Sequence, residues 1–308
     1  MTRRPLVLLL AVGLDLLAGE PASPRHPVAW IGRGLTALEG RLRRRTVADG
    51  AVAVTAVMLG AAGAGALVAR AGRRLGAIGV GLEAVALKLA FAVRRLGAAA
   101  REVERALRSA DGGAARRLVG RHLVSRDTRG LGPDEIVSAT VESVAENLTD
   151  SVAAPLLAYA AAGLPGAWAY RVVNTADAMW GYRDPRHEAF GKVAARLDDL
   201  MNLVPARLAA GTLIAGAALT GARAVEAWRV TRRDHGKTES PNAGWPMAAM
   251  AGALDVALAK RGSYRLGRGP LPSDPATIGR ALRVFAAATA ITVGVAWLLA
   301  GWRTGGPE

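Results

Sequence analysis

The chain has 308 residues, of which 51% are hydrophobic, with no cysteine and a formal net charge of +15. This composition favours a membrane protein over a soluble one, and the lack of cysteine excludes disulfides, thiolate metal sites and a cysteine nucleophile. Arginine supplies most of the positive charge. We interpret it as the positive-inside bias of a membrane protein and expect no nucleic-acid binding, because no aromatic-interleaved basic motif occurs.

Six segments are candidate membrane helices. Three of them approach the roughly 20 apolar residues that a helix needs to cross the hydrocarbon, one is shorter, and two are interrupted by charges. In chain order they are 5–19 (interrupted by Asp15), 50–69, 75–93 (with Glu83 and Lys88), 151–170, 208–222 (the shorter one) and 284–302. The pattern predicts an all-α, polytopic integral membrane protein, with 1–308 as a single domain and with helical loops in the cytoplasm.

The polar segments between these spans are rich in arginine, which favours the cytoplasmic side of a cell (inner) membrane. The first apolar stretch follows Arg3 and Arg4 like a secretory signal, but it lacks a small-x-small cleavage site, so we expect it to be retained. Residues 94–123 predict a soluble amphipathic helix or helix pair, with a break at Gly112-Gly113. Residues 262–275 are expected to form a loop, and no alternation persists long enough to predict a sheet.

Segment 151–170 is expected to be bent. It contains Pro155, Pro165 and the turn-like string Gly163-Leu-Pro-Gly166. A bent or re-entrant pair of short helices would let every polar segment reach the same cytoplasmic face, whereas a full crossing would divide them between the two sides.

Three acids precede this segment at four-residue intervals. Glu142, Glu146 and Asp150 would share one helical face, with Asn147 beside them. The stripe is either a solvated face or a site that handles a cation or a phosphate.

Two further strings contain acids, amides and arginines. Asn174 and Asp177 form an oxygen-rich pair at i, i+3, followed by Gly181-Tyr-Arg183. Asp198 and Asp199 lie between Arg196 and Arg207, an arrangement that suits a phosphate bridged by Mg²⁺, with acids on the cation and guanidinium groups on oxygens. Charge anchoring beside the membrane is the alternative interpretation.

A Pro/Asn/Gly loop, Ser240–Pro246, opens an apolar helix expected over Met247–Leu254. Its backbone N–H groups, together with Asn242, could bind an anion, although an ordinary helix cap explains the string nearly as well. The chain has no P-loop, Gly-x-Gly-x-x-Gly turn or His-Glu-x-x-His motif.

In their order along the chain, these strings resemble the adenosylcobinamide-phosphate synthase family of cobalamin biosynthesis. The matching strings are Asp15–Pro21, His26–Gly32, Ser125–Thr128, Glu142–Asp150, Tyr170–Asp177, Gly181–Arg183, Phe190-Gly191, Ala195–Asp199, Asn202, Pro205–Arg207 and Pro241–Leu254. Two positions depart from the pattern, because an aspartate is usual at Glu20 and an acid is common at Met247. Met247 therefore cannot serve as an acid here.

The resemblance implies a membrane enzyme that joins adenosylcobyric acid to (R)-1-aminopropan-2-yl phosphate, with ATP as co-substrate and Mg²⁺ as cofactor. We expect Asp177, Asp198 and Asp199 to bind the metal and Glu146 or Asp150 to act as the base. Substrate and phosphate contacts are expected from Arg183, Arg196, Arg207, Asn147, Asn174 and Asn242. The lipid bilayer and other corrin-pathway enzymes are further expected partners.

Two other functions remain open. Polar residues near broken membrane segments also build transport pathways, although the halves of this chain are not repeats of one another. A non-catalytic membrane scaffold for corrin-pathway enzymes is the third candidate. The sequence also leaves open whether ATP would give an acyl phosphate or an acyl adenylate.

Overall fold

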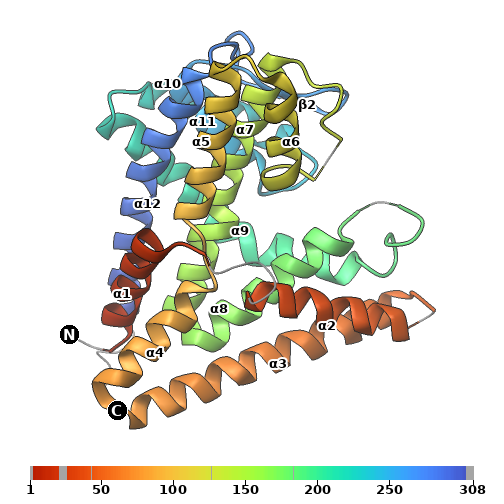
Figure 1. Cartoon of the computed structure of the whole chain (residues 1–308), viewed down its shortest axis with the longest axis vertical. Coiled ribbons are helices and arrows are strands. Elements are labelled where there is room, and N and C mark those ends of the chain that lie inside the picture. The colour runs from red at the N-terminus through yellow and green to blue at the C-terminus, as the bar shows by residue number, and fades with distance from the viewer. Residues whose placement is uncertain (1–2, 21–25, 43, 126, 183, 303–308) are drawn as a thin grey trace. The chain divides into compact units, whose positions relative to one another are not determined.

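The structure, a computed structural model, describes residues 3–20, 26–42, 44–125, 127–182 and 184–302. These residues form long helices and one small hairpin (Figure 1). The helices are α1 (Arg3–Ala18), α2 (Pro27–Arg41), α3 (Val47–Arg74), α4 (Gly76–Lys88), α5 (Arg94–Arg108), α6 (Gly112–His122), α7 (Pro133–Leu148), α8 (Ala154–Trp180), α9 (Lys192–Leu219), α10 (Ala224–Asp234), α11 (Gly244–Leu254) and α12 (Ala276–Trp302). A π-helical turn, η2 (Thr149–Ala153), precedes α8, and a 3₁₀ turn, η3 (His235–Lys237), follows α10.

The chain divides into two compact units, each built from separate stretches of sequence. Unit 1 comprises residues 1–92, 154–202 and 293–308, and unit 2 comprises residues 93–153 and 203–292. Helices α9 and α12 each contribute residues to both units.

Four helical stretches of the described chain are long and apolar enough to cross a membrane. They are Val47–Arg74, Pro133–Trp180, Lys192–Leu219 and Ala276–Trp302. The predicted all-α, polytopic membrane architecture is therefore confirmed. The weaker candidates at 5–19 and 75–93 form α1 and α4, which have 16 and 13 residues.

Helix α8 contains a sharp bend. Gly163 adopts φ 67° and ψ −156°, a left-handed conformation that an L side chain rarely adopts. A Cβ added to Gly166 would lie only 2.5 Å from the carbonyl oxygen of Ala158. Gly166 and Ala158 are eight positions apart, and in a straight helix they would be separated by about 12 Å along the axis. Their contact therefore means that α8 folds back on itself as a tight helical hairpin, whose second arm begins at Leu164. Whether this hairpin re-enters a bilayer from one side stays a prediction.

Within unit 1, α3 packs along α8, and α2 packs against both of them (Figure 1). Glycine permits the closest approach: a Cβ on Gly65 would be 3.0 Å from the backbone of Leu164, at the bend of α8. Small residues let helix backbones approach in this way inside membranes. The bend is thus supported from its outer side by a spanning helix.

Within unit 2, α7 packs against α5, α6 and α11, and α10 packs against α11. Helices α9 and α12 also meet here: a Cβ on Gly216 would lie 2.9 Å from the carbonyl oxygen of Val284, and the Thr292 hydroxyl lies 3.2 Å from that of Thr212. The apolar helix expected at Met247–Leu254 is present as α11, which starts three residues earlier.

Two sequence expectations in unit 2 were wrong. Strands β1 (Leu258–Lys260) and β2 (Tyr264–Leu266) form an antiparallel hairpin where the sequence predicted no sheet and a loop from residue 262. Strands of three residues are too short to produce a visible alternation. The break between α5 and α6 lies at Ser109–Asp111 rather than at Gly112-Gly113, because the Asp111 carboxylate caps α6 by accepting the N–H of Ala114.

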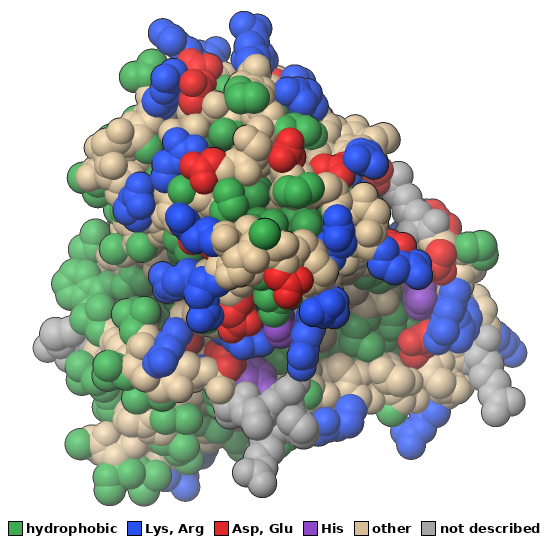
Figure 2. All heavy atoms as spheres, turned by 45° about the horizontal axis from the view of Figure 1, so that its top comes forward, with side chains coloured by type: hydrophobic (Ala, Val, Ile, Leu, Met, Phe, Trp, Pro, Cys, Tyr) green, Lys and Arg blue, Asp and Glu red, His purple; other side chains and the backbone are tan. Residues whose placement is uncertain are grey.

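Exposed arginines are frequent on α5, α6 and α10 of unit 2. Figure 2 shows Lys and Arg side chains with interspersed acids over the face turned forward in that view, and hydrophobic side chains gathered at its lower left. The exposed arginines of these helices are Arg94, Arg95, Arg101, Arg105, Arg108, Arg117, Arg121, Arg229, Arg232 and Arg233.

Candidate functional site

A hydrogen-bonded polar network joins α8 to the start of α9 in unit 1. The Asp198 carboxylate accepts from both amides that face it: Asn174 Nδ2 lies 3.3 Å from Oδ1, and Asn202 Nδ2 lies 2.9 Å from Oδ2. The Tyr170 hydroxyl donates to Asn202 Oδ1 at 3.0 Å, and Arg171 Nη1 donates to Asn174 Oδ1 at 3.0 Å. We call these five residues the Asp198 network.

The Asp198 network is held rigidly. Asn202 and Tyr170 are buried, and the Arg171 guanidinium also donates to the carbonyl oxygen of Ala90 at 2.8 and 2.5 Å. Buried polar groups of this kind are costly unless each finds a partner, and a fully satisfied network fixes its members in place. The sequence had singled out Asn174 and Asp198, and the structure brings them together.

The other predicted metal ligands lie close by in sequence but do not form a ready-made cage. Asp199 is half-buried with Arg196 Nη1 at 3.8 Å, and Arg196 is itself exposed. Asp177 is half-buried on α8. Among the described residues, no three His, Asp or Glu side chains form a group that could hold a metal ion. Mg²⁺ usually takes one or two carboxylates together with waters and substrate phosphates, so the assignment of Asp177, Asp198 and Asp199 stays a prediction.

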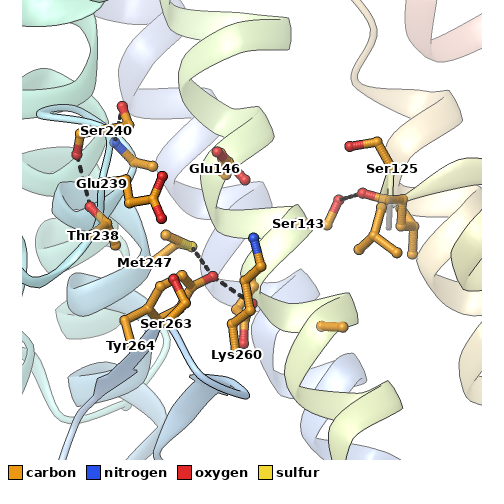
Figure 3. A pocket seen from close by; sticks show the side chains of 15 residues that line it. Ser125, Ser143, Glu146, Thr238, Glu239, Ser240, Met247, Lys260, Ser263 and Tyr264 are labelled. Carbon is orange, nitrogen blue, oxygen red and sulfur yellow. Dashed lines mark hydrogen bonds between the residues drawn. The ribbon is translucent and has the colours of Figure 1, made fainter. Parts of the chain in front are cut away.

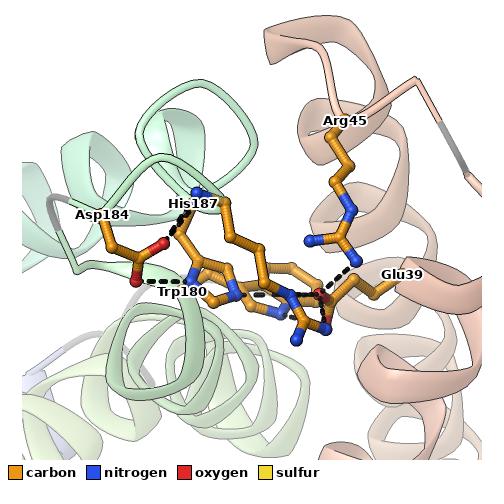
Figure 4. Close-up of polar contacts among 6 residues, drawn as sticks. Glu39, Arg45, Trp180, Asp184 and His187 are labelled. Atoms are coloured by element: carbon orange, nitrogen blue, oxygen red, sulfur yellow. Dashed lines mark hydrogen bonds and ion pairs between the residues drawn. The ribbon is translucent and has the colours of Figure 1, made fainter.

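Arg183, a predicted phosphate ligand, lies outside the described residues. The loop that follows it is fastened to α2 through Glu39, as Figure 4 shows. Glu39 Oε1 accepts from Arg186 at 3.0 and 2.6 Å, Glu39 Oε2 accepts from Trp180 Nε1 at 3.2 Å, and His187 Nδ1 lies 2.9 Å from Asp184 Oδ2. Burial raises the pKa of Glu39, but the hydrogen bonds from Arg186 and Trp180 outweigh it and lower the pKa below its usual value. No local pattern marks this contact, since 141 positions separate Glu39 from Trp180.

A second ionic cluster in unit 1 contains the string that begins at Asp15. Lys88 Nζ lies 2.7 Å from Glu20 Oε1 and 3.6 Å from Asp15 Oδ1, and His26 Nε2 lies 2.5 Å from Glu20 Oε2. Burial raises the pKa of Glu20, but hydrogen bonds from His26 and Lys88 reverse the shift and lower it. Glu20, at the position where the sequence resemblance led us to expect an aspartate, contacts both Lys88 and His26.

In unit 2, the three acids of α7 and η2 do not share one environment. Glu142 is buried, and its carboxylate accepts from Ser138 at 2.7 Å and from Tyr264 at 2.8 Å, which excludes a solvated face for this residue. Glu146 is half-buried and faces a pocket, while Asp150 lies in the π-helical turn and does not line it. An extra residue in the turn shifts the side chains that follow it, so the predicted stripe of three acids ends after Glu146.

Asn147, a predicted substrate ligand, uses its amide within the helix. Its Nδ2 donates to the Ser143 carbonyl oxygen at 3.0 Å, and its Oδ1 accepts from Ser151 at 2.9 Å. These bonds place Asn147 beside the start of the π-helical turn. Its predicted contact with substrate is not tested by the structure.

A pocket of about 290 Å³ opens between α7, the loop before α11 and the β-hairpin (Figure 3). Glu142 and Glu146 come from α7, Glu239 from the loop, and Lys260 and Tyr264 from the hairpin. Sequence analysis missed the last three residues, because segments far apart in the chain build the site and nothing in their local pattern marks them. Met247, where the sequence resemblance led us to expect an acid, lines the same pocket and lies 3.8 Å from the Tyr264 hydroxyl.

Arg207 and Asn242 are brought together on another side of unit 2. Arg207 Nη1 donates to Asn242 Oδ1 at 3.1 Å and to the Leu203 carbonyl oxygen at 2.8 Å, and its guanidinium carbon lies 4.7 Å from the Trp245 ring centroid. Trp245 stacks on His235 with ring centroids 4.1 Å apart. A guanidinium held by a fork of acceptors and an aromatic face is pre-organised, and its outer donors suit an anion.

The fold and these sites define a polytopic helical membrane protein that holds acids, amides and arginines at fixed positions. A family model described as CobD/Cbib protein matches residues 8–291. The cobalamin biosynthesis protein CobD of Dehalococcoides mccartyi (strain CBDB1) is 39% identical over 282 residues, which covers 90% of this chain and 91% of that protein.

Two further relatives agree. The cobalamin biosynthesis protein CobD of Chromobacterium violaceum is 42% identical over 295 residues, covering 91% of each chain. The probable cobalamin biosynthesis protein CobD of Methanothermobacter thermautotrophicus is 40% identical over 261 residues, covering 85% of this chain and 86% of the relative. No solved structure matches the chain. The chain belongs to the CobD/Cbib family and has a role in cobalamin biosynthesis.

Proposed function

We propose that this protein is an ATP-dependent amide ligase that joins adenosylcobyric acid to (R)-1-aminopropan-2-yl phosphate and yields adenosylcobinamide phosphate. The family membership supports the pathway. The observation that carries the chemistry is the Asp198 network, a carboxylate fixed by two amides at the meeting of two long apolar helices. A polar arrangement so costly beside a membrane is expected to serve a function.

The reaction needs an activated carboxylate, because a free carboxylate is a poor electrophile. Attack of the corrin carboxylate on ATP forms an acyl phosphate and releases ADP, or forms an acyl adenylate and releases pyrophosphate. The amine nitrogen then attacks the acyl carbon, the C–N bond forms, the C–O bond to phosphorus breaks, and phosphate or AMP leaves. A carboxylate takes the proton that the ammonium must lose, and Glu146 or Asp150 is the proposed base.

In this proposal Mg²⁺ would be bound through one or two carboxylates of Asp177, Asp198 and Asp199, together with the phosphates of the nucleotide. When bound, Mg²⁺ neutralises charge on the transferring phosphoryl group. In this proposal, Asn174 and Asn202 orient Asp198, and Arg196, Arg207 and Arg183 contact phosphate oxygens in bidentate fashion.

The assay for this function uses purified protein with adenosylcobyric acid, aminopropanol phosphate and Mg-ATP, analysed by mass spectrometry for corrin and nucleotide. We expect the mass of the amide product, with either ADP or AMP naming the intermediate. If the folded protein forms no amide, the ligase hypothesis is rejected, and the transporter and scaffold hypotheses become the favoured ones. Uptake of a corrin into proteoliposomes without amide formation would favour the transporter.

We further propose that the protein lies in the cell (inner) membrane with its motif loops in the cytoplasm, where ATP is present. The cysteine-free chain gives a clean test by single substitutions Ser125→Cys, Ala178→Cys and Ser240→Cys. Only thiol reagents that cross the membrane should label them. Labelling of the Ala178 position by an impermeant reagent from outside would overturn this orientation and the re-entrant form of α8.

A further inference from the structure

The pocket of unit 2 is lined by α7, the start of α11, the β-hairpin and the two connecting segments 123–125 and 238–243. The hairpin is fixed to α7, because the Ala259 N–H donates to Ser138 Oγ at 3.0 Å and Tyr264 donates to Glu142 at 2.8 Å. Ser138 Oγ in turn donates to Glu142 Oε1 at 2.7 Å, so both oxygens of the buried Glu142 carboxylate accept hydrogen bonds.

The charges that face this pocket have two signs. Figure 3 shows the carboxylates of Glu146 and Glu239 and the ammonium of Lys260 directed toward the same space. With Glu142, the wall holds three acids and one lysine, so a ligand with a positive group is favoured overall while one position favours a negative group. Hydroxyl groups of serine, threonine and tyrosine line the remaining polar wall.

The volume limits the ligand further. About 290 Å³ has room for several water-sized groups, which suits a small ligand. A small molecule with an ammonium group at one end and an anionic group at the other would match the charges of the wall.

We propose that this pocket is the binding site of the amine substrate, a short-chain primary amine bearing a phosphate, with Glu146 and Glu239 holding the ammonium and Lys260 holding the phosphate. The assignment rests on the proposed ligase function and adds to it a place for one substrate and two residues, Glu239 and Lys260, with stated tasks. Because Glu146 contacts the ammonium in this arrangement, it is also the nearer of the two candidate bases to the proton that must leave.

Binding can be measured without turnover, in full-length protein in detergent, by isothermal titration with and without Mg-ATP. Three probes separate the two ends of the ligand: aminopropan-2-yl phosphate, 1-aminopropan-2-ol, which has only the ammonium, and isopropyl phosphate, which has only the anion. The variants are Glu239→Gln and Lys260→Met. Both side chains are exposed at the pocket wall, so neither change should unfold the protein. Glu226→Gln and Arg268→Met are the matched controls, since both lie in unit 2 and neither lines the pocket.

We expect Glu239→Gln to weaken binding of the two amine probes about tenfold and to leave binding of isopropyl phosphate unchanged. Lys260→Met should weaken binding of the two phosphate probes about tenfold and leave binding of 1-aminopropan-2-ol unchanged. The controls should bind like the parent protein. Wild-type affinities in both variants, equal losses for all probes, or no binding of aminopropan-2-yl phosphate would overturn the pocket assignment. If the variants bind all probes like the parent protein while the protein still forms the amide, the pocket assignment is rejected and the ligase function stands. If the charge-specific losses of binding occur but no amide forms, the pocket assignment stands and the ligase function is rejected.

Discussion

Asp198 in unit 1 and Glu239 in unit 2 are both candidate functional carboxylates, but their surroundings differ. Asp198 lies on a long apolar helix, and amides on α8 and α9 hold both of its oxygens. Glu239 is exposed, on a loop at the wall of a pocket. A carboxylate fixed in advance suits charge that develops during a reaction, whereas a carboxylate on an accessible loop suits a ligand that must enter and leave. Under the proposed function, we therefore expect Asp198 to act in the chemical step and Glu239 in substrate capture.

The largest effect is expected at Asp198. Asp198→Asn keeps the shape but removes the charge that the amides of Asn174 and Asn202 orient, so turnover should fall by roughly 10²-fold or more. Asp199→Asn is expected to lose turnover as well, since the sequence pairs the two acids. Amide formation by the purified variants measures both, with Glu188→Gln on an exposed loop of unit 1 as the control. If both aspartate variants form the amide at the parental rate, these acids are not part of the catalytic site and serve as charged groups beside the membrane.

Unit 2 depends on a different carboxylate for its stability. Asp234 is fully buried, and it accepts from Arg233 at 2.8 and 2.7 Å and from the Gly267 N–H at 2.8 Å, with Lys237 Nζ 2.6 Å away. Asp234→Asn should lower the free energy of unfolding by about 2 kcal/mol, because hydrogen bonds to a charged group are lost inside the fold.

The pH dependence of this effect has a definite sign. Burial raises the pKa of Asp234, but its hydrogen bonds outweigh burial and lower the pKa well below its ordinary value. A lowered pKa contributes stability that is present above the unfolded value near pH 4 and is lost as the pH falls further. Thermal unfolding from pH 7 to pH 3 should therefore show a gap between parent and Asp234→Asn that is constant above about pH 5 and narrows progressively as the pH falls below about 4. If the difference in stability between the two proteins does not change with pH, the substitution acts through packing and not through the charge of Asp234.

Arg207 tests pre-organisation in unit 2. Arg207→Lys keeps the charge but loses the Nη1 contacts with Asn242 and the Leu203 carbonyl and the stacking on Trp245, so the apparent KM for a phosphate-bearing substrate should rise about tenfold. Arg196→Lys should raise the apparent KM less, because Arg196 is exposed and makes one long ion pair, with Asp199. Equal and unchanged KM values in both variants would indicate that the two arginines only orient the protein in the membrane.

Glu39 gives the smallest expected effect, a local one. Glu39→Gln weakens the ion pairs that fasten the loop 184–190 to α2, so hydrogen exchange of that loop should rise several-fold while α3 and α8 stay protected. The lowered pKa of Glu39 predicts that acid should loosen the same loop in the parent protein below about pH 4. Exchange that is uniform across unit 1 would mean that Glu39 supports the whole unit.

The features that the sequence predicted correctly are those that depend on the local pattern of residues. Apolar runs at 50–69 and 284–302 lie within α3 and α12, and the prolines and glycines of segment 151–170 coincide with the bend at Gly163. The sequence also selected Asn174 and Asp198 by residue type. Their pairing across 24 positions depends on how α8 meets α9, which periodicity does not encode. The pocket residues Glu239 and Lys260 were missed for the same reason, because only the tertiary fold brings them to Glu146.

The most direct measurement of the central claim follows the oxygen atoms of the corrin carboxylate. Adenosylcobyric acid labelled with ¹⁸O at the reacting carboxylate is incubated with the protein, aminopropanol phosphate and Mg-ATP, and all products are weighed by mass spectrometry. Ligation through an activated carboxylate predicts an amide that retains one ¹⁸O, with the second ¹⁸O in inorganic phosphate or in AMP. Corrin that retains both labels, with no label in any phosphate product, would contradict the assignment of this membrane protein as an ATP-dependent amide ligase.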